Sequence, residues 1–242
     1  MFKITPQGTL TTVYSFCSEI NCADGDVPTS GVVQARDGNF YGVTFRGGAY
    51  LNGTVFKVTP DGTLTTLHSF DNIDGTYPYS ALVQATDGNF YGTTIGGGAY
   101  SDGTVFEITS VGTLTTLRSF QGTDGEMPGG GLLQATSGML YGTTALGGSS
   151  GFGTVYSLSV GLGRFVEMLP AAGKVGENIT ILGDGMKGST AVSFNGTPAT
   201  TFRALNTAIR VTVPTGATTG IVEVVTASGS VLKSNARFRI IP

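Results

Sequence analysis

Few side chains in this sequence are suited to acid–base or nucleophilic chemistry. The single histidine, His68, aligns with Tyr14 and Arg118 in other copies of an internal repeat. A general base would have to differ from its repeat siblings for a chemical reason, whereas a position that accepts tyrosine, histidine and arginine is typical of a variable strand position. One histidine also gives no convincing serine–histidine–aspartate set. The sequence therefore predicts no catalytic residue.

Acidic residues offer one candidate metal site. Asp24, Asp74 and Asp124 recur before glycine, which a turn explains. Only "CADGD" brings two of these carboxylates together, those of Asp24 and Asp26, and calcium prefers several such oxygen ligands. We favour a capped turn over calcium. Two cysteines and one histidine are too few for a zinc site, so no metal and no cofactor is predicted.

The two cysteines, Cys17 and Cys22, lie in "CSEINC". They are either free thiols or a disulfide that closes a short loop. We favour the disulfide, because the pair lies in the one loop between repeats that is longer than its equivalents.

Two exposed-looking tyrosines suggest a carbohydrate site. Tyr50 and Tyr100 each follow "GGA", and a ring at such a position could stack on a sugar face. The alternative is that each ring covers a sheet edge or a neighbouring copy. Ser150 replaces them in the third copy, so we favour the packing interpretation and keep the stacking role as speculative.

These residues belong to an internal repeat with a period of fifty residues. "DGNFYGVT" (37–44), "DGNFYGTT" (87–94) and "SGMLYGTT" (137–144) recur in step, as does "GTLTT" before each unit ends. Such a period is typical of propellers and solenoids. Each copy holds four β-prone segments separated by tight-turn residues, which predicts a four-stranded propeller blade. The predicted packing positions are Phe40, Phe90, Tyr41, Tyr91, Tyr141, Gly42, Gly92 and Gly142.

The strand count gives about three and a half blades over residues 1–168. A half unit (2–16) precedes units at 31–70, 81–120 and 132–168, and the last ends in a degenerate fourth strand near "GRFVEML" (163–169). Closed propellers usually need four to eight blades. We therefore expect a fragment of a longer protein with blades upstream, or else pairing of two chains.

Residues 169–242 predict a second, Ig-like β-sandwich domain. Alternating segments replace the repeat, and Asn195-Gly196 reads as a two-residue hairpin turn. The predicted core positions are Ile179, Ile181, Val192, Phe194, Val211, Val213, Val222, Val224 and Phe238.

Composition supports an all-β chain and excludes several partners. Glycine is abundant, at 39 of 242 residues, and charged residues make up only 12%. The net charge is −3 without a basic stripe, so no nucleic-acid or membrane-surface binding is predicted. No apolar run approaches the length of a membrane span, and no signal peptide occurs within this chain.

The ordered blocks "LVQATDGNFYGTT", "GTVF" and "GTLTTLxSF" resemble the GloVer tandem repeat of predicted bacterial surface proteins with a choice of anchors. The resemblance covers residues 1 to about 168. It implies a secreted or surface-exposed protein, and a cysteine pair like Cys17 and Cys22 is common at that place in the family. The family has no established catalytic residues to transfer.

The C-terminal blocks "ILGDG", "VSFNG" and "VTVP" resemble an IPT/TIG domain over residues 169–242. In bacterial surface proteins, the resemblance implies a spacer or an interaction module. Together these features predict a non-catalytic cell-surface scaffold, adhesion or protein-interaction protein whose partner is a surface protein or glycan. The alternatives are a carbohydrate-binding module of a polysaccharide-degrading system, and a hydrolase whose active site lies in upstream blades.

Overall fold

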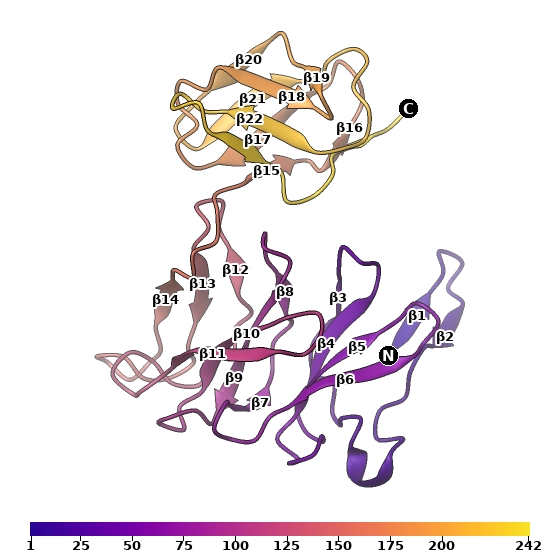
Figure 1. Ribbon diagram of the computed structural model, residues 1–242, viewed down its shortest axis with the longest axis vertical. Helices are drawn as coiled ribbons and strands as arrows, with labels where there is room; N and C mark the ends of the chain where they lie inside the picture. Colours follow the sequence, from indigo (N-terminus) through magenta and orange to yellow (C-terminus); the bar gives the residue numbers. More distant parts are fainter. The chain divides into compact units, whose positions relative to one another are not determined.

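The computed structural model describes residues 1–242 as strands and loops, with one 3-10 turn, η1 (Ile20–Cys22). The predicted all-β class is confirmed. Contacts divide the chain into two compact units, which are described separately (Figure 1). The N-terminal unit comprises Met1–Leu133 and Leu140–Val160, and the C-terminal unit comprises Gln134–Met139 and Gly161–Pro242. None of the chain's helical structure is long and apolar enough to cross a membrane.

The first two full copies of the repeat are antiparallel meanders with the same register. The first copy contains β3 (Val33–Gln34), β4 (Phe40–Thr44), β5 (Thr54–Val58) and β6 (Leu64–Ser69). The second contains β8 (Val83–Gln84), β9 (Phe90–Gly96), β10 (Thr104–Ile108) and β11 (Leu114–Ser119), with β7 (Thr76–Pro78) also paired to β9. Both copies carry a bulge at the same point of the third strand. Their strands pair within each copy, so the copies are not rungs of a solenoid.

The flanking parts of the repeat are shorter. The half unit forms the hairpin of β1 (Phe2–Ile4) and β2 (Leu10–Thr12), as predicted. The third copy holds β12 (Leu133–Gln134), β13 (Leu140–Thr143) and β14 (Val155–Leu158). The fourth strand expected near 163–169 is not in this sheet. That segment forms β15 (Val166–Leu169), which pairs with β17 of the C-terminal unit because Val166 and Met168 are buried in that unit's core.

Aromatic rings connect each copy to the next. A phenylalanine after the last strand of one copy meets an aromatic ring on the third strand of the following copy. The centroid distances are 4.9 Å for Phe16–Phe56, 5.2 Å for Phe70–Phe106 and 4.9 Å for Phe120–Tyr156. Through this forward contact, each copy covers part of the apolar surface of the copy before it.

The predicted packing role holds for the tyrosines of the first two copies but is wrong for the third. Tyr41 and Tyr91 are 1% exposed, and Tyr41 stacks on Phe90 of the next copy at 4.0 Å. Tyr141 is 40% exposed. Tyr41 and Tyr91 donate hydrogen bonds of 2.8 Å to Asp37 and Asp87, whereas the third copy has Ser137 at that position, so its tyrosine has no such acceptor.

The repeated glycine of the second strand makes room for a ring. A Cβ atom on Gly92 would lie 2.5 Å from Cζ of Phe106 and 2.8 Å from Cδ2 of Leu82. Gly42 faces Phe56 in the same way, and Gly142 faces Tyr156. The atoms that exclude a side chain at this position belong to neighbouring side chains rather than to the backbone.

The Tyr156 hydroxyl gives a first prediction. Phe56 and Phe106 occupy this position in the other copies, and the Tyr156 oxygen is buried without a hydrogen-bond partner. Burial raises the pKa of this phenol. Tyr156→Phe should raise the free energy of unfolding by about 1 kcal/mol, because the unsatisfied hydroxyl is removed while the ring remains. Urea denaturation measures the change, and Tyr50→Phe, at an exposed ring, serves as the control. A destabilised Tyr156→Phe would show that the hydroxyl has a favourable partner.

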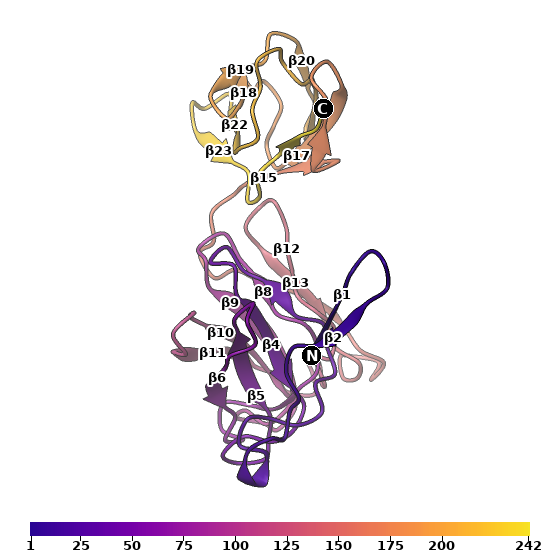
Figure 2. The same cartoon turned by 90° about the vertical axis from the view of Figure 1, so that its right-hand side faces the viewer.

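The C-terminal unit holds two four-stranded sheets. One has the order β15–β17–β21–β20 and the other β19–β18–β22–β23, and the two are seen on opposite sides of this unit in Figure 2. Their bounds are β17 (Asn178–Gly183), β21 (Ala208–Thr212), β20 (Phe202–Ala204), β19 (Thr197–Pro198), β18 (Ala191–Phe194), β22 (Val222–Val225) and β23 (Val231–Lys233). A parallel pair, β16 (Ala172–Gly173) and β24 (Arg239–Ile240), completes the unit.

One hydrophobic cluster lies between these strands and contains all nine predicted core residues. The alternation that places every second side chain inward is therefore confirmed for this unit. The hairpin at Asn195-Gly196 is also confirmed, with positive φ angles of 47° and 84° joining Phe194 to its partner Thr197.

Candidate functional site

The repeat gathers its long loops at one end of each sheet, which we call the loop end. It consists of the loops after the second strand (45–53, 95–103, 145–153) and the loops that precede the repeated proline (17–27, 71–77, 121–127). Backbone hydrogen bonds join the two kinds of loop. The N–H groups of Gly48, Gly98 and Gly148 donate to the carbonyl oxygens of Cys22, Asn72 and Gly122, at 2.9, 2.9 and 2.8 Å. Beneath them, paired threonine hydroxyls 2.8 to 2.9 Å apart cross-link the strands, at Thr44–Thr54, Thr94–Thr104 and Thr144–Thr154. The loop end is thus a repeated, internally bonded platform.

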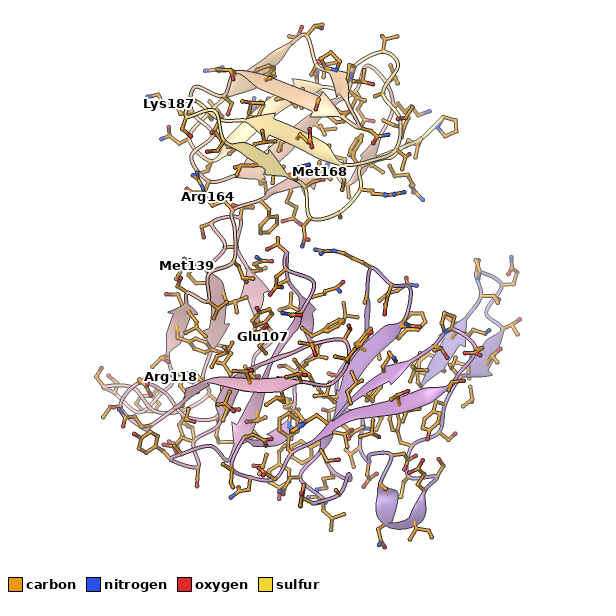
Figure 3. All side chains as sticks on the ribbon, viewed as in Figure 1. Glu107, Arg118, Met139, Arg164, Met168 and Lys187 are labelled. Carbon is orange, nitrogen blue, oxygen red and sulfur yellow. A yellow bond between two sulfur atoms is a disulfide. The ribbon has the colours of Figure 1, made fainter.

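The repeated aspartate is the polar centre of each loop pair. Each one bonds the variable residue near the end of the preceding copy's last strand: Tyr14 donates to Asp24 at 2.8 Å, and His68 lies 2.6 Å from Asp74. Arg118, labelled in Figure 3, forms an ion pair with Asp124. The only histidine therefore has the same structural partner as its tyrosine and arginine equivalents. Sequence reasoning identified the variable position but missed the pairing, although every residue type found there can donate a hydrogen bond.

Asp24 is the most enclosed of these carboxylates, at 1% exposure. One oxygen accepts bonds from the Ser18 N–H at 3.0 Å and the Ser18 hydroxyl at 2.8 Å, in addition to the Tyr14 hydroxyl. Burial by itself would raise the pKa of Asp24, but these donors outweigh it and hold the pKa below its ordinary value. The same competition, with His68 as a donor, lowers the pKa of Asp74.

A pH prediction follows from Asp24. A carboxyl with a lowered folded-state pKa stabilises the fold fully above its unfolded pKa of about 3.9, and this contribution is lost as the pH falls through the folded pKa. Asp24→Asn should therefore cost about 1–3 kcal/mol at pH 7 and clearly less at pH 3. Urea denaturation at both pH values measures this. Glu19→Gln, an exposed change in the same loop, should cost little at either pH. A cost for Asp24→Asn that is equal at both pH values would contradict the prediction.

The candidate calcium ligands are occupied by protein donors. Asp24 is bonded as described, and Asp26 Oδ1 accepts the N–H of Val27 at 2.8 Å. No group of three or more histidine, cysteine, aspartate or glutamate side chains is arranged to hold a metal ion. Nearby, Cys17 and Cys22 are joined as a disulfide, with their Cα atoms 4.0 Å apart.

The speculative stacking residues lie at the loop end and are open to solvent. Tyr50 is 60% exposed and Tyr100 is 59% exposed. Each precedes a residue with positive φ, Leu51 at 63° and Ser101 at 67°, so a tight turn presents the ring. The packing interpretation, in which these rings cover a sheet edge or neighbour, does not fit such exposure. Neither Tyr50 nor Tyr100 takes part in a ring–ring contact, unlike the nearby rings of Tyr14 and Tyr77.

Sequence reasoning missed two surface features. A hollow of about 390 Å³ lies between the second and third copies, lined by Tyr79, Ile95, Met127, Gly129, Gly130, Thr143, Thr144 and Ala145. Its sequence signal is Gly129, at a position where the two preceding copies have Thr29 and Tyr79. In the C-terminal unit, Arg203 and Arg210 show no clustering in the sequence, yet they are register partners on β20 and β21.

Comparisons with known proteins give one sequence family. The profile of the Gloeobacter/Verrucomicrobia repeat matches residues 1–204, and so extends past residue 168, where we expected the repeat to end. No curated protein matches the chain.

Two solved structures are similar at low identity. Selenomethionine-substituted virginiamycin B lyase from Staphylococcus aureus is 9% identical, with a TM-score of 0.36, over 91% of this chain and 72% of that one. A protein provisionally described as a gluconolactonase is 14% identical, with a TM-score of 0.42, over 96% of this chain and 79% of that one. At TM-scores below 0.5, neither likeness determines a fold or an activity for this chain.

Proposed function

We propose a function from the premise that this chain belongs to the Gloeobacter/Verrucomicrobia repeat family. The chain is a non-catalytic, secreted or cell-surface bacterial protein that acts as a scaffold, adhesion or protein-interaction module. Its repeats are blades of a partial β-propeller of about three and a half blades, and its C-terminal unit is an Ig-like module of the IPT/TIG type that serves as a spacer or second contact.

This proposal rests on the side chains of the loop end. Its repeated aspartates Asp24, Asp74 and Asp124 are engaged in bonds that recur from copy to copy, which accounts for them structurally. Several of its large apolar or aromatic side chains are instead exposed, including Tyr50 and Leu51 at 60% and Tyr100 at 59%. Exposed aromatic residues on a rigid support are typical anchors of binding surfaces.

The third copy of the repeat supplies the test variant. It has Ser150 and Gly151 where the first copy has Tyr50 and Leu51, so Tyr50→Ser, Leu51→Gly and Tyr100→Ser introduce only residues that the repeat already accepts. The labelled chain should be retained on fixed bacterial cells, and the triple variant should lose at least ten-fold in apparent affinity. Val111→Thr, exposed at the opposite end of the sheet, should bind normally. Equal retention of the triple variant would refute a role for the loop end.

A carbohydrate-binding module is the second candidate, favoured by the exposure of Tyr50 and Tyr100. A glycan array distinguishes the two functions. Binding to a defined glycan that Tyr100→Ser abolishes would favour carbohydrate recognition, whereas retention on cells without array binding favours a protein partner.

The proposed location outside the cytoplasm has its own test. Disulfides persist in oxidising compartments, so protein isolated from its native cells without reductant should contain the Cys17–Cys22 bond. Peptide mass spectrometry after thiol blocking detects it. Full alkylation of both cysteines would argue against the extracytoplasmic assignment, as would protection from external protease on intact cells.

A further inference from the structure

The hollow between the second and third copies has a counterpart fifty residues earlier, which the half-exposed ring of Tyr79 covers in part. There, the Tyr79 ring meets Phe45 edge-on at 6.1 Å, and Phe45 also stacks on Tyr77 at 5.0 Å. The positions equivalent to Phe45, Tyr77 and Tyr79 are Ile95, Met127 and Gly129. The repeat therefore contains a version of this site with a phenol ring in place and a version from which that ring is missing.

A hydroxyl is uncovered by the same departure from the repeat. In the second copy, the Ser80 hydroxyl lies 3.1 Å from that of Thr93, which is 1% exposed. In the third copy Gly130 replaces Ser80, and the corresponding Thr143 is exposed and lines the hollow. The site thus combines apolar contacts from Ile95 and Met127 with one hydroxyl that can donate or accept a hydrogen bond.

We infer that this hollow binds a small phenolic compound, whose ring takes the place that the Tyr79 ring has beside Phe45 in the preceding junction. Ile95 and the Met127 thioether contact the ring, Tyr79 forms an aromatic wall, and Thr143 bonds the phenolic hydroxyl. The volume of about 390 Å³ falls within the range of small-molecule sites and exceeds the needs of a single tyrosyl side chain. This site is separate from Tyr50 and Tyr100 and does not depend on their proposed function.

The probe is p-cresol, which is the side chain of tyrosine as a free molecule. For eight heavy atoms in an open site, we expect a dissociation constant on the order of 1 mM. Titration followed by NMR should shift the methyl signals of Ile95 and Met127 saturably. Toluene, which lacks the hydroxyl, should bind about five-fold more weakly, and Thr143→Val should remove that preference.

Two variants fill the hollow from different sides. Gly129→Tyr restores the residue of the preceding copy, and its Cβ would lie an ordinary 3.5 Å from Cγ2 of Ile95. Ala145→Phe restores the Phe45 of the first copy. Either variant should weaken p-cresol binding at least ten-fold while the remaining amide signals stay in place, and the second serves if the first fails to fold. Val111→Ala is the matched surface control.

The outcomes are decisive. Saturable NMR shifts at Ile95 and Met127 that disappear in Gly129→Tyr or Ala145→Phe support the site. NMR shifts that never saturate would overturn the inference, and so would p-cresol binding that persists in a folded Gly129→Tyr or Ala145→Phe variant. Binding of a tyrosine-containing peptide where p-cresol does not bind would overturn it as well.

Discussion

Replacing Phe90 by alanine should lower the free energy of unfolding of the N-terminal unit by about 3–5 kcal/mol. The Phe90 side chain is fully buried and stacks on Tyr41 of the preceding copy at 4.0 Å with an interplanar angle of 24°. Its truncation leaves a cavity between two sheets, each of which is fixed by its own hydrogen bonds and cannot easily collapse into the space. Urea denaturation measures the loss.

Phe40→Ala is the matched control, because it makes the same change at the same repeat position. Phe40 is only partly buried and no stacked ring covers it. We expect it to cost less than half as much as Phe90→Ala. Equal costs for the two variants would mean that the ring stabilises its own copy rather than the junction between copies.

Gly92→Val should be the second large effect, at about 3 kcal/mol. The backbone of Gly92 needs no left-handed conformation, so the cost is purely steric: the first added carbon would already lie 2.5 Å from the Phe106 ring. Gly131→Val is the control, because a Cβ there meets no atom within 4 Å. It should change stability by less than about 0.5 kcal/mol.

A double-mutant cycle identifies the cause. Phe106→Leu makes room beside Gly92, so the two changes together should cost clearly less than the sum of their separate costs. Additive costs would show that Phe106 is not what excludes a side chain at residue 92.

Much of the fold could be predicted because its signals are local. The turn predicted at Asn195-Gly196 depends only on neighbouring residues, as does the alternation predicted at Ile179 and Ile181. Both predictions are confirmed. β15 was misassigned because "VEML" alternates equally well for either unit, and its partner β17 is determined by packing. The exposure of Tyr141 was also missed, since burial depends on neighbours from another copy, such as the Phe90 ring that stacks on Tyr41.

The candidate site was less predictable than the fold. Tyr50 and Tyr100 could be named from their glycine-rich loops, but their exposure depends on what packs nearby. Asp24 and Asp74 each pair with a residue near the end of the preceding strand. That partner is Tyr14 in one copy and His68 in the next, so an alignment of the copies does not reveal the pairing. The hollow depends on a missing side chain at Gly129, and a sequence cannot show what that omission uncovers.

The forward contacts Phe16–Phe56, Phe70–Phe106 and Phe120–Tyr156 have a mechanical consequence. Each copy closes its own hydrogen-bonded sheet and relies on its nearest neighbour for the rest of its burial, so its stability is a local sum rather than a property of the whole chain. A chain held at one end and pulled at the other would then lengthen in steps of about fifty residues. In each step one copy would unfold and absorb work while the remaining copies stay folded.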